Sequence, residues 1–116
     1  MGFVYYGNYP LYYEVGRTEL MRSLGIPYSK LESKGIILPV VKMEASYYAP
    51  ARYDDLITIK TSIKKRPGVR ITFDYVIYKE GALLNKGMTT LAFTQATSNK
   101  PLRPTAELDA LWDEYF

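Results

Sequence analysis

Met1-Gly2-Phe3-Val4-Tyr5-Tyr6-Gly7-Asn8-Tyr9 opens the chain and leads directly into a helical pattern that extends to Leu24. The stretch predicts a glycine-containing turn that ends at a helix N-terminus, where the first backbone N–H groups have no partners inside the helix. Asn8 is a suitable N-cap, and Pro10 fits the first turn because its missing N–H costs nothing there. The positive end of the helix dipole lies behind these N–H groups, so the turn is suited to hold a negatively charged oxygen.

The helix that follows this turn is apolar around much of its circumference, which predicts a buried helix. Leu11 and Val15 lie along one side, and Tyr9, Tyr13 and Leu20 widen the apolar surface. Such a helix needs a sheet or other helices around it.

After residue 35 the apolar period changes from 3.6 to two, which predicts strands. Pro67-Gly68 and Glu80-Gly81 predict turns between strands, and Gly87 is a candidate bulge position. The expected strands cover residues 36–48, 56–65, 70–79 and 82–97, and the expected helices cover residues 8–24, 29–34 and 105–115. This order predicts an α+β fold, with an antiparallel sheet curled around one long central helix, in a single domain over residues 1–116.

The chain has 116 residues, none of which is Cys or His. Their absence excludes disulfides, thiolate nucleophiles, His-based triads and the commonest metal-ligand sets, so we expect no metal site and no cofactor. Carboxylates, Lys and Tyr remain for acid–base chemistry. The sequence shows neither a signal-peptide pattern nor a membrane-spanning apolar run, so we expect a cytoplasmic protein without membrane insertion.

Several motifs, taken in order, resemble the hotdog-fold acyl-CoA thioesterases of the 4-hydroxybenzoyl-CoA thioesterase type. The resemblance covers nearly the whole chain and keeps the order and spacing of the motifs. They are Gly2–Tyr9, Glu14-x-x-Arg17, Leu24-Gly25, Pro39-Val40 and Ala49-Pro50-Ala51-x-Tyr53-Asp54-Asp55-Leu56. The resemblance implies a hydrolase that cleaves an acyl-CoA thioester to a free acid and CoA. It also implies a homodimer or a tetramer of dimers, with active sites at the subunit boundaries.

In the family that the chain resembles, the catalytic Asp stands three residues before the Gly of the opening turn. Counted onto this sequence, that position lies two residues upstream of Met1. The first strand of the fold leads into the same Asp. We therefore expect a domain that is N-terminally truncated relative to the family and lacks its first edge strand, which leaves backbone groups of the neighbouring strand unpaired.

The resemblance assigns oxyanion stabilisation to the backbone N–H of Tyr6, which precedes Gly7; alternatively, these two residues only form a tight entry turn. Asn8 either caps the helix or positions a water molecule. Glu14 stands eight residues after Tyr6, the spacing at which a second branch of hotdog thioesterases carries its carboxylate, and it is a candidate base or nucleophile. The alternative for Glu14 is a local contact with a residue three or four positions later.

Substrate-binding residues are expected in two places. Tyr9 and Tyr13 are candidates to line the acyl pocket, although core packing explains them equally well. The hairpin that contains Pro67-Gly68 carries four cations, which are suited to the phosphates of CoA or to a solvated hairpin tip that discourages edge aggregation. These cations are Lys64, Lys65, Arg66 and Arg70.

Two other classes of function compete with the hydrolase. One is a non-catalytic hotdog module that binds acyl-CoA or an acyl carrier. The other is a single-stranded nucleic-acid binder, suggested by the net charge of +3 and the 12 Tyr residues. The tyrosines cluster on the helix and not among the basic residues, so we expect no nucleic-acid partner. A hotdog dehydratase is disfavoured because its chemistry needs a His.

Overall fold

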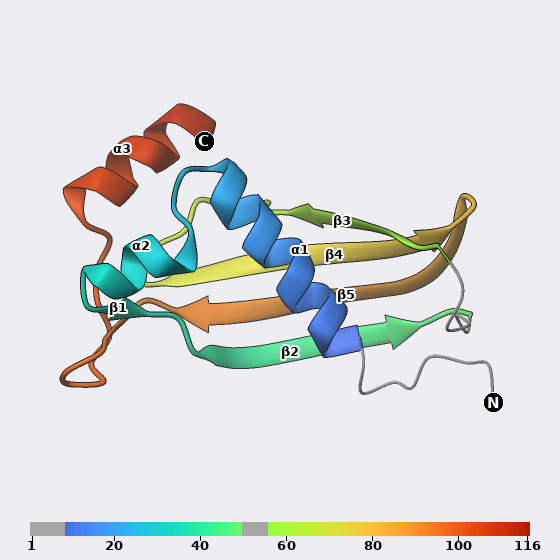
Figure 1. Ribbon diagram of the computed structural model, residues 1–116, viewed down its shortest axis with the longest axis horizontal. Helices are drawn as coiled ribbons and strands as arrows, with labels where there is room; N and C mark the ends of the chain where they lie inside the picture. The colour runs from blue at the N-terminus through green and yellow to red at the C-terminus, as the bar shows by residue number, and fades with distance from the viewer. Residues whose placement is uncertain (1–8, 50–55) are drawn as a thin grey trace.

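One long helix lies across one face of a four-stranded antiparallel sheet (Figure 1). The structure is a computed structural model, and it describes residues 9–49 and 56–116. The helix is α1, Tyr9–Ser23. The strands, in their order across the sheet, are β2 (Val40–Tyr47), β5 (Ala82–Ala92), β4 (Arg70–Lys79) and β3 (Thr58–Ser62). The expected α+β architecture with an antiparallel sheet and a central helix is confirmed.

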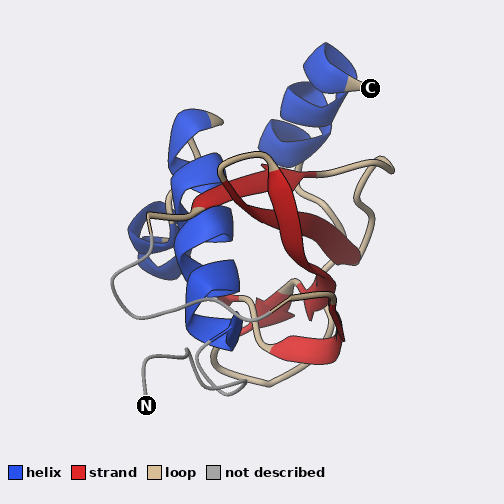
Figure 2. Ribbon diagram, turned by 90° about the vertical axis from the view of Figure 1, so that its right-hand side faces the viewer, coloured by secondary structure: helices blue, strands red, loops and turns tan. Residues whose placement is uncertain are grey.

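Smaller elements close one end of this layer pair. They are α2 (Tyr28–Ser33), β1 (Ile36–Ile37), β6 (Thr94–Gln95) and α3 (Ala106–Tyr115). The short strands β1 and β6 pair with each other as a separate two-stranded sheet. Figure 2 shows the strands curling beside α1, with α3 standing apart at the C-terminal end.

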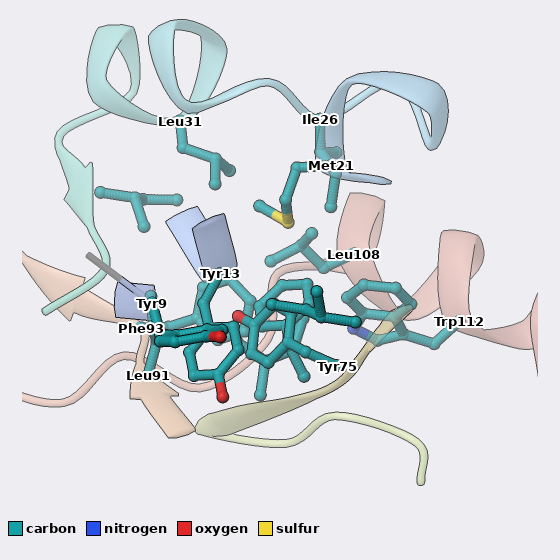
Figure 3. Close-up of a cluster of buried hydrophobic side chains, with 14 of the residues drawn as sticks. Tyr9, Tyr13, Met21, Ile26, Leu31, Tyr75, Leu91, Phe93, Leu108 and Trp112 are labelled. Atoms are coloured by element: carbon teal, nitrogen blue, oxygen red, sulfur yellow. The ribbon is translucent and has the colours of Figure 1, made fainter. Parts of the chain in front are cut away.

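The central helix is buried on one side only. Tyr9, Tyr13 and Met21 face the sheet and are buried, whereas the side chains of Leu11 and Val15 are 58% and 56% exposed. The prediction of a helix buried around most of its circumference is therefore wrong for a single copy of the chain. Figure 3 shows the buried side chains of α1 meeting Tyr75 and the other core residues of the sheet.

Two glycines let α1 approach the sheet closely. A Cβ added at Gly16 of α1 would lie under 3.0 Å from Thr61 Oγ1 of β3. A Cβ added at Gly87 of β5 would lie under 3.0 Å from atoms of the Tyr13 ring. Gly87 pairs regularly with Tyr75 and Ala45 on its two neighbouring strands, so the predicted bulge at Gly87 is wrong. The glycine is needed to make room for a tyrosine.

Long-range pairing shortens or divides several expected strands. The expected strand over residues 36–48 is interrupted before Pro39 and becomes β1 and β2, because β1 pairs with β6 and β2 pairs with β5. The strand expected over residues 82–97 divides in the same way at Phe93. The turn predicted at Glu80-Gly81 is confirmed: both residues have positive φ, and Lys79 pairs with Ala82 across a two-residue hairpin loop.

The terminal helix α3 is held by its apolar side and by charges at two points. Leu108 and Trp112 are buried, and Thr105 caps the helix by accepting a hydrogen bond from the Leu108 N–H at 3.3 Å. Glu107 forms ion pairs with two lysines of the α2 region, and Asp113 accepts a 2.6 Å hydrogen bond from Arg66. The lysines are Lys30, whose Nζ lies 2.9 Å from the carboxylate, and Lys34.

Replacing Gly87 by Ala should destabilise the fold. The added methyl group would collide with the Tyr13 ring, and overpacking of this kind costs about 1–3 kcal/mol. Urea unfolding followed by circular dichroism measures the change. Gly68→Ala is the control: a Cβ there meets nothing within 4 Å, so its unfolding free energy should stay within about 0.5 kcal/mol of the wild type. Equal stabilities of the two variants would contradict the close approach.

The Glu107 contacts predict a dependence of stability on pH. Hydrogen bonds from Lys34 and Lys30 lower the pKa of Glu107 from its ordinary 4.5 to about 2. Because the folded pKa lies below the unfolded one, this stabilisation is complete above pH 4.5 and is lost as the pH falls toward 2. The thermal midpoint of wild type minus that of Glu107→Gln should therefore shrink across that window and stay constant above it. A difference that does not change with pH would contradict the ion pairs.

Candidate active site at the start of the central helix

The expected oxyanion site falls at the first turn of α1. The helix begins at Tyr9 with Pro10 in its first turn, one residue from the predicted start. The candidates Tyr6, Gly7 and Asn8 lie outside the described residues, so their roles stay predictions. The structure does show helix α1, which follows these residues directly in the chain and whose first turn is the positive end of its dipole.

Tyrosine rings form the surroundings of this helix start. Tyr9 is buried and makes edge-to-face contacts with Tyr12, at 5.7 Å between ring centroids, and with Tyr47 of β2, at 5.2 Å. Tyr47 is 42% exposed, so the cluster extends from the core to the surface. Side chains of α1 and β2 thus meet beside the helix N-terminus, which gives the site an aromatic wall.

Tyr13, one helical turn after Tyr9, is also fully buried. Its ring stacks on Tyr75 with 4.4 Å between centroids and 14° between planes, and its hydroxyl donates to Asn85 Oδ1. Burial raises the pKa of Tyr13 to about 12, so the hydroxyl keeps its proton at any physiological pH. Without a ligand, Tyr13 belongs to the core beneath the site, and its predicted contact with the acyl group stays a prediction.

Glu14 is exposed on α1 and has no local partner. Among the described residues it forms no ion pair or hydrogen bond, and in particular none with Arg17 or Thr18. The Arg17 guanidinium instead lies 3.2 Å from the Tyr28 hydroxyl, to which its Nε donates. Burial raises the pKa of Tyr28, and the nearby charge of Glu14 adds to this rise. The carboxylate of Glu14 is therefore available for another role.

The basic hairpin lies away from the helix start. It connects β3 and β4 at the end of the sheet where α1 finishes (Figure 1). Arg70 precedes the buried Ile71 on β4, and since successive side chains of a strand alternate, Arg70 faces away from α1. A groove of about 470 Å³ on this outer face is lined by all four cations and by Asp74 and Met88. Within one copy of the chain, the structure does not bring Lys64, Lys65, Arg66 and Arg70 together with the helix start.

The cations of the hairpin differ in their partners. Arg66 lies within 3.7 Å of Asp109 and bonds to Asp113, so it ties the hairpin to α3. Lys64 lies 3.8 Å from Asp74. Lys65 and Arg70 form no ion pair with any described residue. A role of the hairpin in binding phosphates stays a prediction, and Lys65 and Arg70 are its best-placed members.

Sequence reasoning missed Asn85, a fully buried amide on β5. It lies opposite Tyr47 on β2 and Ile77 on β4, and its side chain meets Tyr13 of α1. The only signal in the sequence was an Asn at an alternate position from Gly87 and thus on the same face of the strand. That signal does not show which residue the Asn meets.

Two features of the described part of the chain concern the geometry of metal sites and of membrane-spanning helices. Across residues 9–49 and 56–116, no three acidic side chains come close enough together to hold a metal ion. Each helix described is too short or too polar to cross a bilayer.

Known proteins resemble this chain in sequence. The sequence model of the thioesterase superfamily matches residues 1–85. YneP from Bacillus subtilis is 36% identical over 104 residues, which cover 89% of this chain and 75% of that protein. The acyl-CoA thioester hydrolase YbgC from Escherichia coli O157:H7 is 33% identical over 101 residues, which cover 86% of this chain and 75% of that protein.

Solved structures of known proteins resemble this chain in fold. The DHNA-CoA thioesterase from Staphylococcus aureus superposes with a TM-score of 0.92 at 29% identity. The match covers 99% of this chain and 80% of that one. The expected hotdog fold is thereby confirmed.

Proposed function

The chain belongs to the thioesterase superfamily, and on this premise we propose that it hydrolyses the thioester of an acyl-CoA to a free acid and CoA. The observation that carries the proposal is the start of α1. The helix N-terminus lies beside an aromatic wall formed by α1 and β2, and α1 also carries, farther along, a carboxylate without an ion-pair partner among the described residues. Thioester hydrolysis needs these parts: a donor for the carbonyl oxygen, a surface for the acyl group and a base for water.

In the proposed mechanism the thioester carbonyl accepts a hydrogen bond from the backbone N–H of Tyr6. The helix dipole strengthens this bond as negative charge grows on the oxygen in the transition state, and losing one such donor costs about 10²–10³ in rate. A carboxylate takes a proton from water while the water oxygen attacks the carbonyl carbon. When the tetrahedral intermediate collapses, the C–S bond breaks, the sulfur leaves as thiolate, and the carboxylic acid returns the proton to it.

We assign the carboxylate to Glu14, but the distance along the helix limits which helix start it can serve. From the start of α1 at Tyr9, five residues of helix rise about 7.5 Å to Glu14, which is more than a Glu side chain reaches. A carbonyl held at one helix start is therefore best served by the partner subunit's Glu14. The site would then be complete only in a dimer, which agrees with the expected homodimer or tetramer of dimers.

The strand β2 supports such a dimer. It is an edge strand of the described sheet, and Val41 and Met43 on it are 46% and 45% exposed. Met43 lies opposite the buried Thr89, so it shares the face on which α1 lies. Long apolar edge strands are templates for pairing with another chain, and natural proteins seldom leave them uncovered. We propose that a second copy pairs along β2 and brings its own α1 beside this one.

Glu14→Gln should lower kcat for acyl-CoA hydrolysis by about 10²-fold or more, because it removes the base and leaves the side-chain size unchanged. Glu19→Gln is the matched control on the same helix: Glu19 is exposed and pairs with Arg22 at 2.8 Å, so its loss should leave kcat unchanged. Thiol release from a panel of acyl-CoA esters measures both. Equal kcat for Glu14→Gln and wild type would remove Glu14 from the mechanism. Tight binding of the esters without any thiol release would favour the non-catalytic module.

Met43→Glu should convert the dimer to monomers and abolish thiol release together, because a charge would be buried at the proposed β2 interface. Light scattering coupled to size-exclusion chromatography gives the mass, and circular dichroism checks the fold. Leu56→Glu serves as control, since Leu56 is 91% exposed and lies outside β2. A monomeric wild type, or a Met43→Glu variant that keeps the wild-type mass, would contradict the interface.

A further inference from the structure

A buried hydrogen bond between side chains ties the first half of α1 to the sheet. Tyr13 enters a slot between Tyr75 and Gly87, and its hydroxyl at the end of that slot donates to Asn85 Oδ1. Tyr13 and Asn85 are both fully buried. The contact of the Tyr13 ring with Gly87 determines how close α1 lies to the sheet. The hydrogen bond to Asn85 determines the position of the Tyr13 hydroxyl.

The stability of the fold does not explain this pair. Asn85 Nδ2 has two N–H donors, and they find no partner among residues 9–49 and 56–116. A buried donor left unpaired is unfavourable, whereas replacing two buried hydrogen-bonding partners by apolar groups of the same shape is often neutral or stabilising. A Phe and a Leu, which have nearly the shapes of Tyr and Asn, would leave no donor unpaired at these two positions. The chain nevertheless has the Tyr–Asn pair, which is less favourable for stability than the apolar pair.

A second buried pair of polar side chains beneath α1, unlike Tyr13 and Asn85, leaves no polar atom without a partner. The hydroxyls of Tyr75 and Thr89 lie 2.5 Å apart and satisfy each other. The other buried side-chain atoms without a partner among the described residues are Thr61 Oγ1 and Trp112 Nε1. Thr61 lies under Gly16, and Trp112 belongs to α3, so both are farther along the fold from the helix start. The unsatisfied amide is the one next to the candidate site.

We propose that the Tyr13–Asn85 hydrogen bond is a positioning device that sets the place of the α1 N-terminus for catalysis. The inference rests on the proposed function, because it concerns where the oxyanion donor stands relative to the thioester carbonyl. Tyr13 lies four residues, about one helical turn, after Tyr9, where α1 begins. A shift of α1 along its axis would move the helix N-terminus by the same amount. A misplacement of about 1 Å is enough to cost about 100-fold in rate.

Neither residue touches the reacting atoms in this account, so both are positioning residues. Their loss should lower kcat and leave KM nearly unchanged, because the interaction affected is made mainly in the transition state. The loss of kcat should persist in a variant whose fold is as stable as that of the wild type. A merely structural pair would give the opposite result, since its loss would change stability and leave kcat per folded enzyme intact.

The test is a double-mutant cycle with Tyr13→Phe, Asn85→Leu and the two changes combined, all in the full chain. Each single variant leaves one buried group unpaired, so both should unfold at a lower temperature than the wild type. The double variant should regain the wild-type midpoint or exceed it. Its kcat, measured by thiol release at a temperature where circular dichroism shows it folded, should stay about 10- to 100-fold below wild type. KM should change by less than about twofold.

Thr61→Val is the matched control, because it removes another buried, unpartnered polar atom beneath α1 without changing the side-chain shape. Its kcat should equal that of the wild type. Wild-type turnover together with an unchanged kcat in the double variant would overturn the inference and leave the proposed function standing. An equal loss of kcat in Thr61→Val would overturn it as well, since any change beneath α1 would then suffice. A wild type that releases no thiol from any ester would remove the proposed function and the inference with it.

Discussion

The close contact of α1 with the sheet is the constraint on which the rest of the structure depends. Two glycines permit it, Gly16 on the helix and Gly87 on the strand, and Tyr13 occupies the space that Gly87 leaves. The helix must stand this close for its tyrosines to reach Tyr75 and Asn85. The same contact determines where the helix begins in space, and therefore where its unpaired N–H groups and its dipole act. In the proposed account, the packing of α1 and the position of the candidate site both depend on the distance between α1 and the sheet.

The two ends of α1 lie in different surroundings. Its first turn lies beside exposed and buried tyrosines and next to the edge strand β2. Its last turn lies near α3 and the basic hairpin, where ion pairs of Arg66 and Glu107 hold the terminal helix in place. Arg66 of the hairpin thus holds α3 near one end of α1, while we propose that the chemistry occurs at the other end. We propose that a second copy of the chain completes the site.

Local patterns in the sequence predicted the elements, and contacts between distant residues determined the rest. The start of α1 and the Glu80-Gly81 turn depend on a few adjacent residues, so capping and turn rules located them. The role of Gly87 depends on Tyr13, 74 positions earlier, and nothing near Gly87 reveals it. The exposure of Leu11 depends on what covers the far side of α1. Asn85 was missed because its partner too is distant in sequence.

A crystal structure of the chain with a non-hydrolysable acyl-CoA analogue, in which a methylene group replaces the thioester sulfur, tests the central claim most directly. The account predicts the carbonyl oxygen within hydrogen-bond distance of the Tyr6 backbone N–H, at the start of α1. It also predicts the partner subunit's Glu14 on the other side of the carbonyl carbon. An analogue whose carbonyl lies in the outer groove beside the basic hairpin, away from both helix starts, would contradict the account.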